Sequence, residues 1–221
     1  LINMELKKRI ITSFFLIILL ALMFFYTFAL IISLILIAII SWIEFYGLIS
    51  KIFKKNNIKH KILKFTYKFF SLLYLSIVVY LIILTNTLSP EYNVFIIYSI
   101  LISIMSDIGG LTFGRIFKGK KLTKISPKKT ISGSLGSFIF SILLIPFFLT
   151  FFPQQNFYTL IVITILISFI SQLGDLFISY LKRLAKVKDT SDLLPGHGGV
   201  LDRIDGMMFA IPVGFLILKY I

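Results

Sequence analysis

Long apolar runs alternate with short basic segments along this chain, and that alternation restricts it to a membrane-embedded helical fold. Residues 10–50 contain a single charged residue, Glu44. A helix needs about 20 apolar residues to cross the hydrocarbon core of a bilayer. A mean hydropathy of +0.99 is too high for a soluble domain of 221 residues. The sequence therefore predicts an all-α integral membrane protein, a polytopic helix bundle.

About seven transmembrane helices are expected. Residues 10–50 are long enough for two spans joined by a tight turn near residues 26–29. Five further spans are predicted at residues 69–88, 94–114, 132–152, 157–181 and 203–219. We expect one continuous membrane domain, in which residues 1–93 supply N-terminal spans and residues 94–221 form the catalytic region.

The chain starts with a short basic segment before its first apolar run. Lys7, Lys8 and Arg9 resemble the front of a signal peptide, but the apolar run is long and no small-x-small cleavage site follows. An uncleaved first span is therefore expected. The sequence leaves open whether Leu1 or Met4 is the native start.

The basic residues gather on one side of this seven-span arrangement. Of 23 Lys and Arg residues, all but Lys219 fall before the first span or in residues 51–68, 115–129 and 182–203. The positive-inside rule predicts that the N-terminus and these loops face the cytoplasm, in a multi-pass protein of the inner (plasma) membrane. The net charge of +14 then reflects topology and attraction to anionic membrane lipids, and nucleic-acid binding is not expected. Residues 51–68 suit either an amphipathic helix on the inner leaflet or a solvated basic loop.

The first of three clusters of polar residues that helix packing alone does not explain lies in residues 107–136. Asp107, Gly110 and Gly114 share one helix face, and the glycines allow another helix or a ligand to approach closely. The lysine-rich loop that follows ends in Ser-Pro-Lys-Lys-Thr, directly before the next span. Backbone N–H groups at a helix start, with lysines and hydroxyls, favour an anion site, although a positive-inside loop would also be rich in Lys. The candidate substrate-binding residues of this region are Asp107, Arg115, Ser126, Lys128, Lys129 and Thr130.

A second cluster lies around the end of the predicted span 157–181. Asp175, Ser179 and then Lys182 or Arg183 follow at helical spacing, so they share a face. Such a row suits a metal ion beneath a phosphorylated substrate. A simpler explanation for Lys182 and Arg183 is that they are cations at a helix end whose side chains reach toward the membrane interface. That explanation does not cover Asp175, which lies two turns deeper.

A glycine-rich loop completes the set. Pro195-Gly196-His197-Gly198-Gly199 marks a tight loop, and Asp202 and Asp205 follow at i, i+3. The chain has no cysteine and one nearby histidine, so these oxygen ligands predict Mg²⁺ rather than zinc. We interpret His197 as a substrate contact rather than a metal ligand.

Residues 179–205 then carry a long spaced motif. It reads Ser179-x-Leu181-Lys182-Arg183-x4-Lys188-Asp189-x-Ser191-x2-Leu194-Pro195-x-His197-Gly198-Gly199-Val200-x-Asp202-Arg203-Ile204-Asp205. This resembles the signature of the CDP-diacylglycerol synthase (phosphatidate cytidylyltransferase) family, and residues 107–136 are similar to the family's upstream region. The resemblance implies that CTP and phosphatidate react to give CDP-diacylglycerol and pyrophosphate.

The same resemblance implies a role for each residue. Asp175 and Asp202 would bind metal in a centre of two cations, the second of which need not be divalent, with Asp205 in support. Lys182, Arg183 and Arg203 would neutralise charge on phosphates. Substrate contacts are expected from Ser179, Lys188, Asp189, His197, Gly198 and Gly199. A homodimer is one expected state.

Three other functions fit parts of the pattern. A CTP-dependent enzyme acting on a polyprenyl or ether-lipid phosphate stays open, because acyl-chain contacts are generic apolar surface. An ion or proton transporter would spread polar residues through the membrane depth instead of gathering them at one face. A CDP-alcohol phosphotransferase needs two further acidic residues after Asp205, and this chain has none there.

Overall fold

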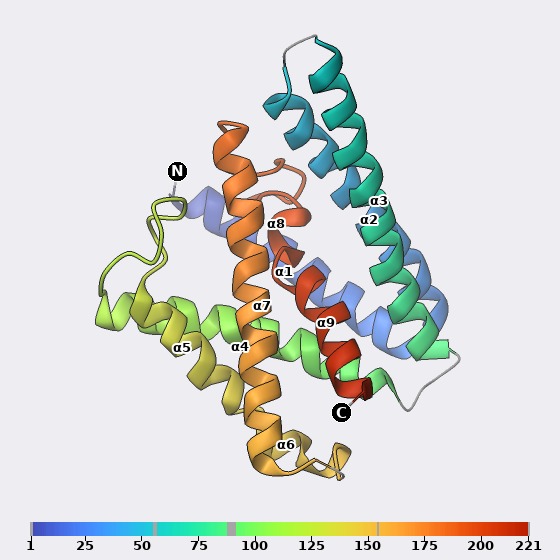
Figure 1. Ribbon diagram of the computed structural model, residues 1–221, viewed down its shortest axis with the longest axis vertical. Coiled ribbons are helices and arrows are strands. Elements are labelled where there is room, and N and C mark those ends of the chain that lie inside the picture. Colours follow the sequence, from blue (N-terminus) through green and yellow to red (C-terminus); the bar gives the residue numbers. More distant parts are fainter. Residues whose placement is uncertain (1, 55–56, 88–91, 154, 221) are drawn as a thin grey trace. The chain divides into compact units, whose positions relative to one another are not determined.

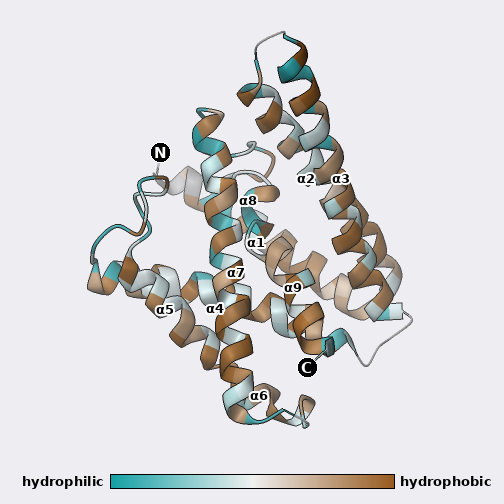
Figure 2. Ribbon diagram, viewed as in Figure 1, coloured by the Kyte–Doolittle hydropathy of each residue, from teal (hydrophilic) through white to brown (hydrophobic). Residues whose placement is uncertain are grey.

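A computed structural model describes residues 2–54, 57–87, 92–153 and 155–220 (Figure 1). Within these ranges the regular elements are helices, and six helical segments are long and apolar enough to cross a membrane. Figure 2 shows hydrophobic residues along most of these helices and hydrophilic ones gathered at helix ends and loops. The predicted all-α polytopic membrane fold is confirmed.

The chain divides into two compact units. One comprises residues 1–83 and 181–204, and the other comprises residues 84–180 and 205–221. In this division most of the glycine-rich motif, residues 181–204, groups with the N-terminal helices.

The first unit begins with the helices α1 (Ile2–Phe25), α2 (Thr27–Ile52) and α3 (Ile58–Thr87). Tyr26 separates α1 from α2 with extended backbone angles, φ −127° and ψ 108°. The predicted turn near residues 26–29 is therefore confirmed, and it is a single non-helical residue.

The basic segment 51–68 is mostly helical, as one of its two suggested structures requires, but this helical part is continuous with the helix that follows. Most of it forms the first turns of α3, which starts well before the predicted residue 69. The side chain of Asn57 accepts a hydrogen bond from the backbone N–H of His60 (3.1 Å) and so caps this helix. Further along, the Lys68 ammonium lies 2.9 Å from the ring centroid of Tyr46 on α2, and Trp42 Nε1 donates to the Lys68 carbonyl (3.1 Å). These contacts hold the basic first turns of α3 against α2. Lys55, within this segment, lies outside the described residues.

The second unit is built on α4 (Asn93–Phe117), which packs closely against α5 (Ile131–Ile142). A Cβ atom added at Gly109 would clash with the carbonyl group of Gly136, and one at Gly133 would lie 2.8 Å from the carbonyl oxygen of Gly110. The glycines near Asp107 thus serve helix packing, one of the two uses that the sequence suggested.

Helix α7 (Phe157–Leu184) packs on α4 through paired hydroxyls as well as apolar side chains. Ser103 and Ser171 lie 2.6 Å apart, as do the hydroxyls of Tyr98 and Thr164. These bonds satisfy polar groups that would otherwise be costly inside a membrane.

The remaining helices are short. They are α6 (Ile145–Phe148), the 3-10 turn η2 (Leu149–Phe151), α8 (Leu201–Ile204) in the first unit and α9 (Met207–Tyr220). Residues 203–219, predicted as a seventh span, are divided between α8 and α9. Helix α9 has 14 residues within the described range and contains Pro212.

Candidate active site

The glycine-rich motif of the first unit forms a folded loop between α7 and α8. At its start, the backbone N–H of Val187 donates to the carbonyl of Lys182 (3.0 Å), which closes the end of α7. Leu194 and Gly198 then form an isolated bridge, with a hydrogen bond of 2.9 Å from Leu194 N to Gly198 O. Gly196 and Gly198 within this turn have φ angles of +77° and +84°, which glycine adopts without strain.

Glu44 of α2 anchors this loop. Its Oε1 accepts hydrogen bonds from Ser191 Oγ (2.6 Å) and the backbone N–H of Val200 (3.0 Å). Its Oε2 accepts from Thr190 Oγ1 (2.9 Å) and the N–H of Leu201 (2.8 Å). The side chain is buried, at 6% exposure, so both oxygens depend on these donors.

From the sequence, Glu44 is only the one charge in an apolar run, and no site role follows from it. A lone carboxylate within a membrane span is itself a sign of function or of a specific partner. That sign was present, but nothing in the sequence connects residue 44 with residues 190–201.

Asp202 holds the same loop from its other side. Lys182 Nζ donates to its Oδ1 (2.6 Å), which makes this a salt bridge. Its Oδ2 accepts from the N–H of Thr190 (2.8 Å) and the N–H of Gly199 (3.1 Å), and it shares the single hydroxyl proton of Thr190 (2.9 Å) with Glu44 Oε2. Burial raises the pKa of this carboxyl, but the bonds from Lys182, Thr190 and Gly199 outweigh burial and lower it overall. Asp202 is therefore an ionised carboxylate with both oxygens bonded.

Several predicted substrate contacts line a cavity on this loop. Arg203 Nε donates to the His197 carbonyl (2.9 Å), which ties α8 to the glycine turn. The cavity has a volume of about 600 Å³, and its lining includes Lys188, Asp189, His197 and Gly198. Arg183, in contrast, is exposed and donates to the carbonyl of Val187 (3.4 Å) at the end of its own helix.

The second unit contains the other predicted site residues. Asp175 of α7 accepts a hydrogen bond from Ser179 Oγ (3.3 Å) and forms an ion pair with Lys129. Thr130 caps α5, and its Oγ1 accepts from the backbone N–H of Gly133 (3.1 Å). The structure thus brings together a proposed phosphate contact and a proposed metal ligand, a pairing that their positions in the sequence do not reveal.

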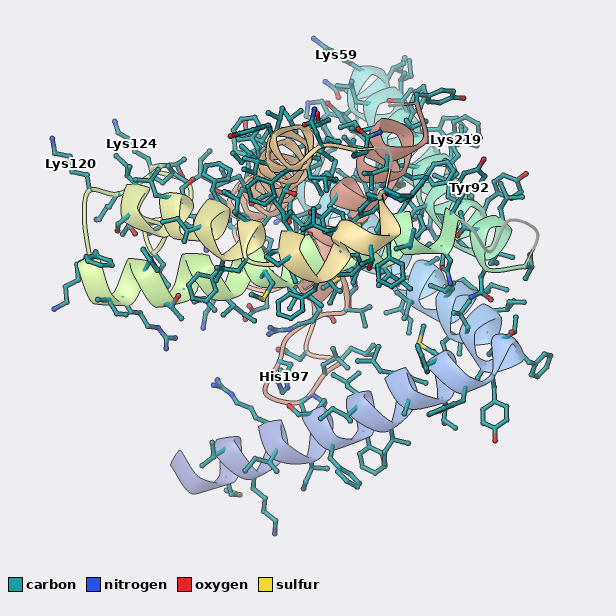
Figure 3. All side chains as sticks on the ribbon, turned by 90° about the horizontal axis from the view of Figure 1, so that it is seen from below. Lys59, Tyr92, Lys120, Lys124, His197 and Lys219 are labelled. Atoms are coloured by element: carbon teal, nitrogen blue, oxygen red, sulfur yellow. The ribbon has the colours of Figure 1, made fainter. Side chains whose placement is uncertain are left out.

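Other predicted members of this cluster are less closely placed. Ser126 belongs to the turn before α5, where its carbonyl accepts from Lys129 N (3.0 Å), while Asp107, Arg115 and Lys128 are exposed. Figure 3 shows Lys120 and Lys124 of the same loop pointing outward. Asp205 is buried and accepts from the N–H of Gly206 (2.8 Å).

The predicted metal centre draws on both units. Asp175 belongs to the second unit and Asp202 to the first. In the part of the chain that the structure describes, no three His, Asp or Glu side chains gather as a metal-binding group. A shared ion at Asp175 and Asp202 therefore stays a prediction. Of the two carboxylates, Asp202 is the more fully bonded to protein donors.

Comparison with known proteins identifies the family. Residues 2–221 match the family model of the cytidylyltransferase family. A stretch of 122 residues is 43% identical to phosphatidate cytidylyltransferase of Staphylococcus haemolyticus, and it covers 54% of this chain and 46% of that protein. The proteins of the same name from Staphylococcus saprophyticus and Staphylococcus aureus are 42% and 41% identical over stretches of the same length. The matched stretch thus spans about half the length of these curated relatives. Because the family model covers nearly every residue, the chain belongs to the cytidylyltransferase family.

Proposed function

We propose that this protein is a phosphatidate cytidylyltransferase, which converts CTP and phosphatidate into CDP-diacylglycerol and pyrophosphate. One observation supports it most: Lys182, Asp202 and the glycine turn of the family motif are fixed around one loop that borders a polar cavity. Membership of the cytidylyltransferase family and the names of the matched relatives favour the same reaction.

The proposed chemistry is a direct transfer. An oxygen of the lipid phosphate forms a bond to the α-phosphorus of CTP, and the bond from that phosphorus to the β-phosphate oxygen breaks, which releases pyrophosphate. The attacking oxygen is already anionic, so the site needs no strong general base. Lys188 and Arg183 are exposed, and Lys129 is paired with Asp175, so we expect these three cations to bind phosphate oxygens.

Magnesium belongs to this proposal, and the carboxylates suit it. Mg²⁺ in nucleotide enzymes takes one or two carboxylates and completes its coordination with phosphates and water. Asp175 has the more available oxygens, because it bonds to one hydroxyl and to the Lys129 ammonium, and it is more exposed than Asp202. Asp202 would have to share Oδ1 with Lys182. When bound there, Mg²⁺, alone or with a second cation, would neutralise charge on the phosphates as pyrophosphate leaves.

The direct test uses purified protein in detergent with α-labelled CTP, Mg²⁺ and a panel of lipid phosphates. We expect labelled CDP-diacylglycerol and equimolar pyrophosphate with phosphatidate. Faster turnover with a polyprenyl or ether-lipid phosphate would instead favour the other substrate class. A reaction without lipid tests the mechanism, because label that stays on denatured protein and later moves into lipid would contradict direct transfer.

We further propose that the site faces the cytoplasm, since CTP is available there and the basic segments flank the site residues. Assembly as a homodimer stays an expectation.

A further inference from the structure

The polar cavity of the first unit is lined by two separate parts of the chain. One part is the motif loop, and the other is the basic first turns of α1, whose charges also predict the orientation of the protein. The lining residues comprise Lys8, Arg9, Lys188, Asp189, Asp192 and His197, together with the glycine turn and Arg203. Its volume of about 600 Å³ falls in the range typical of small-molecule sites.

Specific contacts hold α1 against this loop. Thr12 Oγ1 lies 3.1 Å from the carbonyl oxygen of Pro195. A Cβ atom added at Gly196 would lie 2.8 Å from Arg9 Cγ, so the glycine leaves room for the arginine stem. Figure 3 shows His197 on the loop beside α1.

Some of the charged side chains that line the cavity have partners in the protein, and others do not. Arg203 is bonded to the His197 carbonyl. In the described residues, Lys8, Arg9 and Lys188 have no ion pair, although they lie around one space. His197 Nδ1 is shielded from solvent and has no hydrogen-bond partner within the described ranges. Unpaired cations and an unpaired ring nitrogen around one cavity indicate an anionic ligand with further polar groups.

We propose that this cavity binds the nucleotide substrate and that Lys8 and Arg9 of α1 bind its polyphosphate. The inference rests on the proposed function, and it adds α1 to the substrate site. Three cations suit a triphosphate, whereas Asp189 and Asp192 can accept hydrogen bonds from ribose hydroxyls or a base amino group. Phosphatidate has an anionic phosphate but no such donors on its diacylglycerol, so the mixed lining favours the nucleotide over the lipid.

The test measures equilibrium binding to the full chain in detergent, so it does not depend on turnover. The variants Lys8→Gln and Arg9→Gln remove the charge but keep much of the stem. Lys7→Gln is the matched control, because Lys7 is adjacent and equally basic but does not line the cavity. The ligands are CTP, inorganic tripolyphosphate, cytidine and phosphatidate in mixed micelles.

We expect Lys8→Gln and Arg9→Gln each to weaken binding of CTP and tripolyphosphate about tenfold, as loss of one charge-assisted contact predicts. Cytidine binding should stay unchanged, and Lys7→Gln should bind CTP as the unaltered protein does. Equal losses in all three variants would mean a general surface-charge effect and would overturn the proposal. So would weaker phosphatidate binding with normal CTP binding. If CTP binds in this way but no lipid phosphate is converted, the proposed function fails while the nucleotide site stands.

Discussion

Glu44 offers the sharpest test of how the motif loop is held. In Glu44→Gln, one amide oxygen can still accept two of the four hydrogen bonds, and a neighbouring hydroxyl can rotate to accept from the new NH₂. The backbone N–H of either Val200 or Leu201 then loses its acceptor. Leaving one buried N–H unsatisfied costs about 2 kcal/mol, and Glu44→Ala, which orphans both, costs about 4 kcal/mol.

These free energies predict how fast the loop opens. If the loop amides exchange by local opening, hydrogen–deuterium exchange at Val200 and Leu201 should rise about 30-fold in Glu44→Gln and several hundredfold in Glu44→Ala. Cytidylyl transfer should fall in the same order, because a loop that opens no longer positions Lys188 and His197. Exchange is measured by mass spectrometry on peptides spanning residues 190–201.

Ser41→Ala is the matched control. Ser41 lies one turn earlier on α2, is fully buried, and its hydroxyl has no hydrogen-bond partner in the described part of the chain. This variant should leave both exchange and turnover unchanged. The reasoning is refuted if Glu44→Gln exchanges its Val200 and Leu201 amides at the original rate. It is equally refuted if the loop opens as expected and turnover does not change.

Three further outcomes are expected. Asp175→Asn should abolish nearly all turnover while loop exchange at residues 190–201 stays normal, since it removes a charge from a proposed metal ligand outside that loop; near-normal Mg²⁺-dependent activity would contradict the assignment. Gly136→Ala should lower the thermal unfolding midpoint in detergent, because its Cβ would lie 2.6 Å from the Gly109 carbonyl oxygen and overpacking costs about 1–3 kcal/mol. Gly47→Ala, with nothing within 4 Å of the added atom, should change the midpoint little. A cysteine at Lys121 should resist an impermeant thiol reagent applied to intact cells, and labelling there would reverse the proposed orientation.

The helices were largely predictable because membrane insertion depends on local composition. The run of residues 10–50 contains too many apolar residues for one span, and the break at Tyr26 follows. The early start of α3 was not settled by composition, since its basic first turns suit a surface helix or a loop equally well until the contacts of Lys68 with Tyr46 are known. The break between α8 and α9 was missed because hydropathy does not reveal it.

The candidate site shows a sharper limit. Sequence spacing identifies groups on one helix face, so Asp175 and Ser179 were correctly placed together. It cannot identify the partner of a charge when that partner lies in another segment. A carboxylate near the membrane must be compensated, but the sequence does not say whether by a metal or by a lysine. For Asp175 the structure gives Lys129, and for Asp202 it gives Lys182.

The two ways of compensating a charge have different consequences for Glu44 and Asp175. Glu44 is surrounded by hydroxyl and backbone donors that belong to the folded loop, so its bonds persist as long as the loop does. Asp175 is paired with the end of a flexible lysine side chain, which has other anions to bind once a phosphate is present. A carboxylate bonded to backbone N–H groups is thus suited to hold structure. A carboxylate bonded to a lysine tip is suited to exchange its partner during a reaction cycle. The sequence displays both as isolated acids within apolar helices, and only their donors distinguish them.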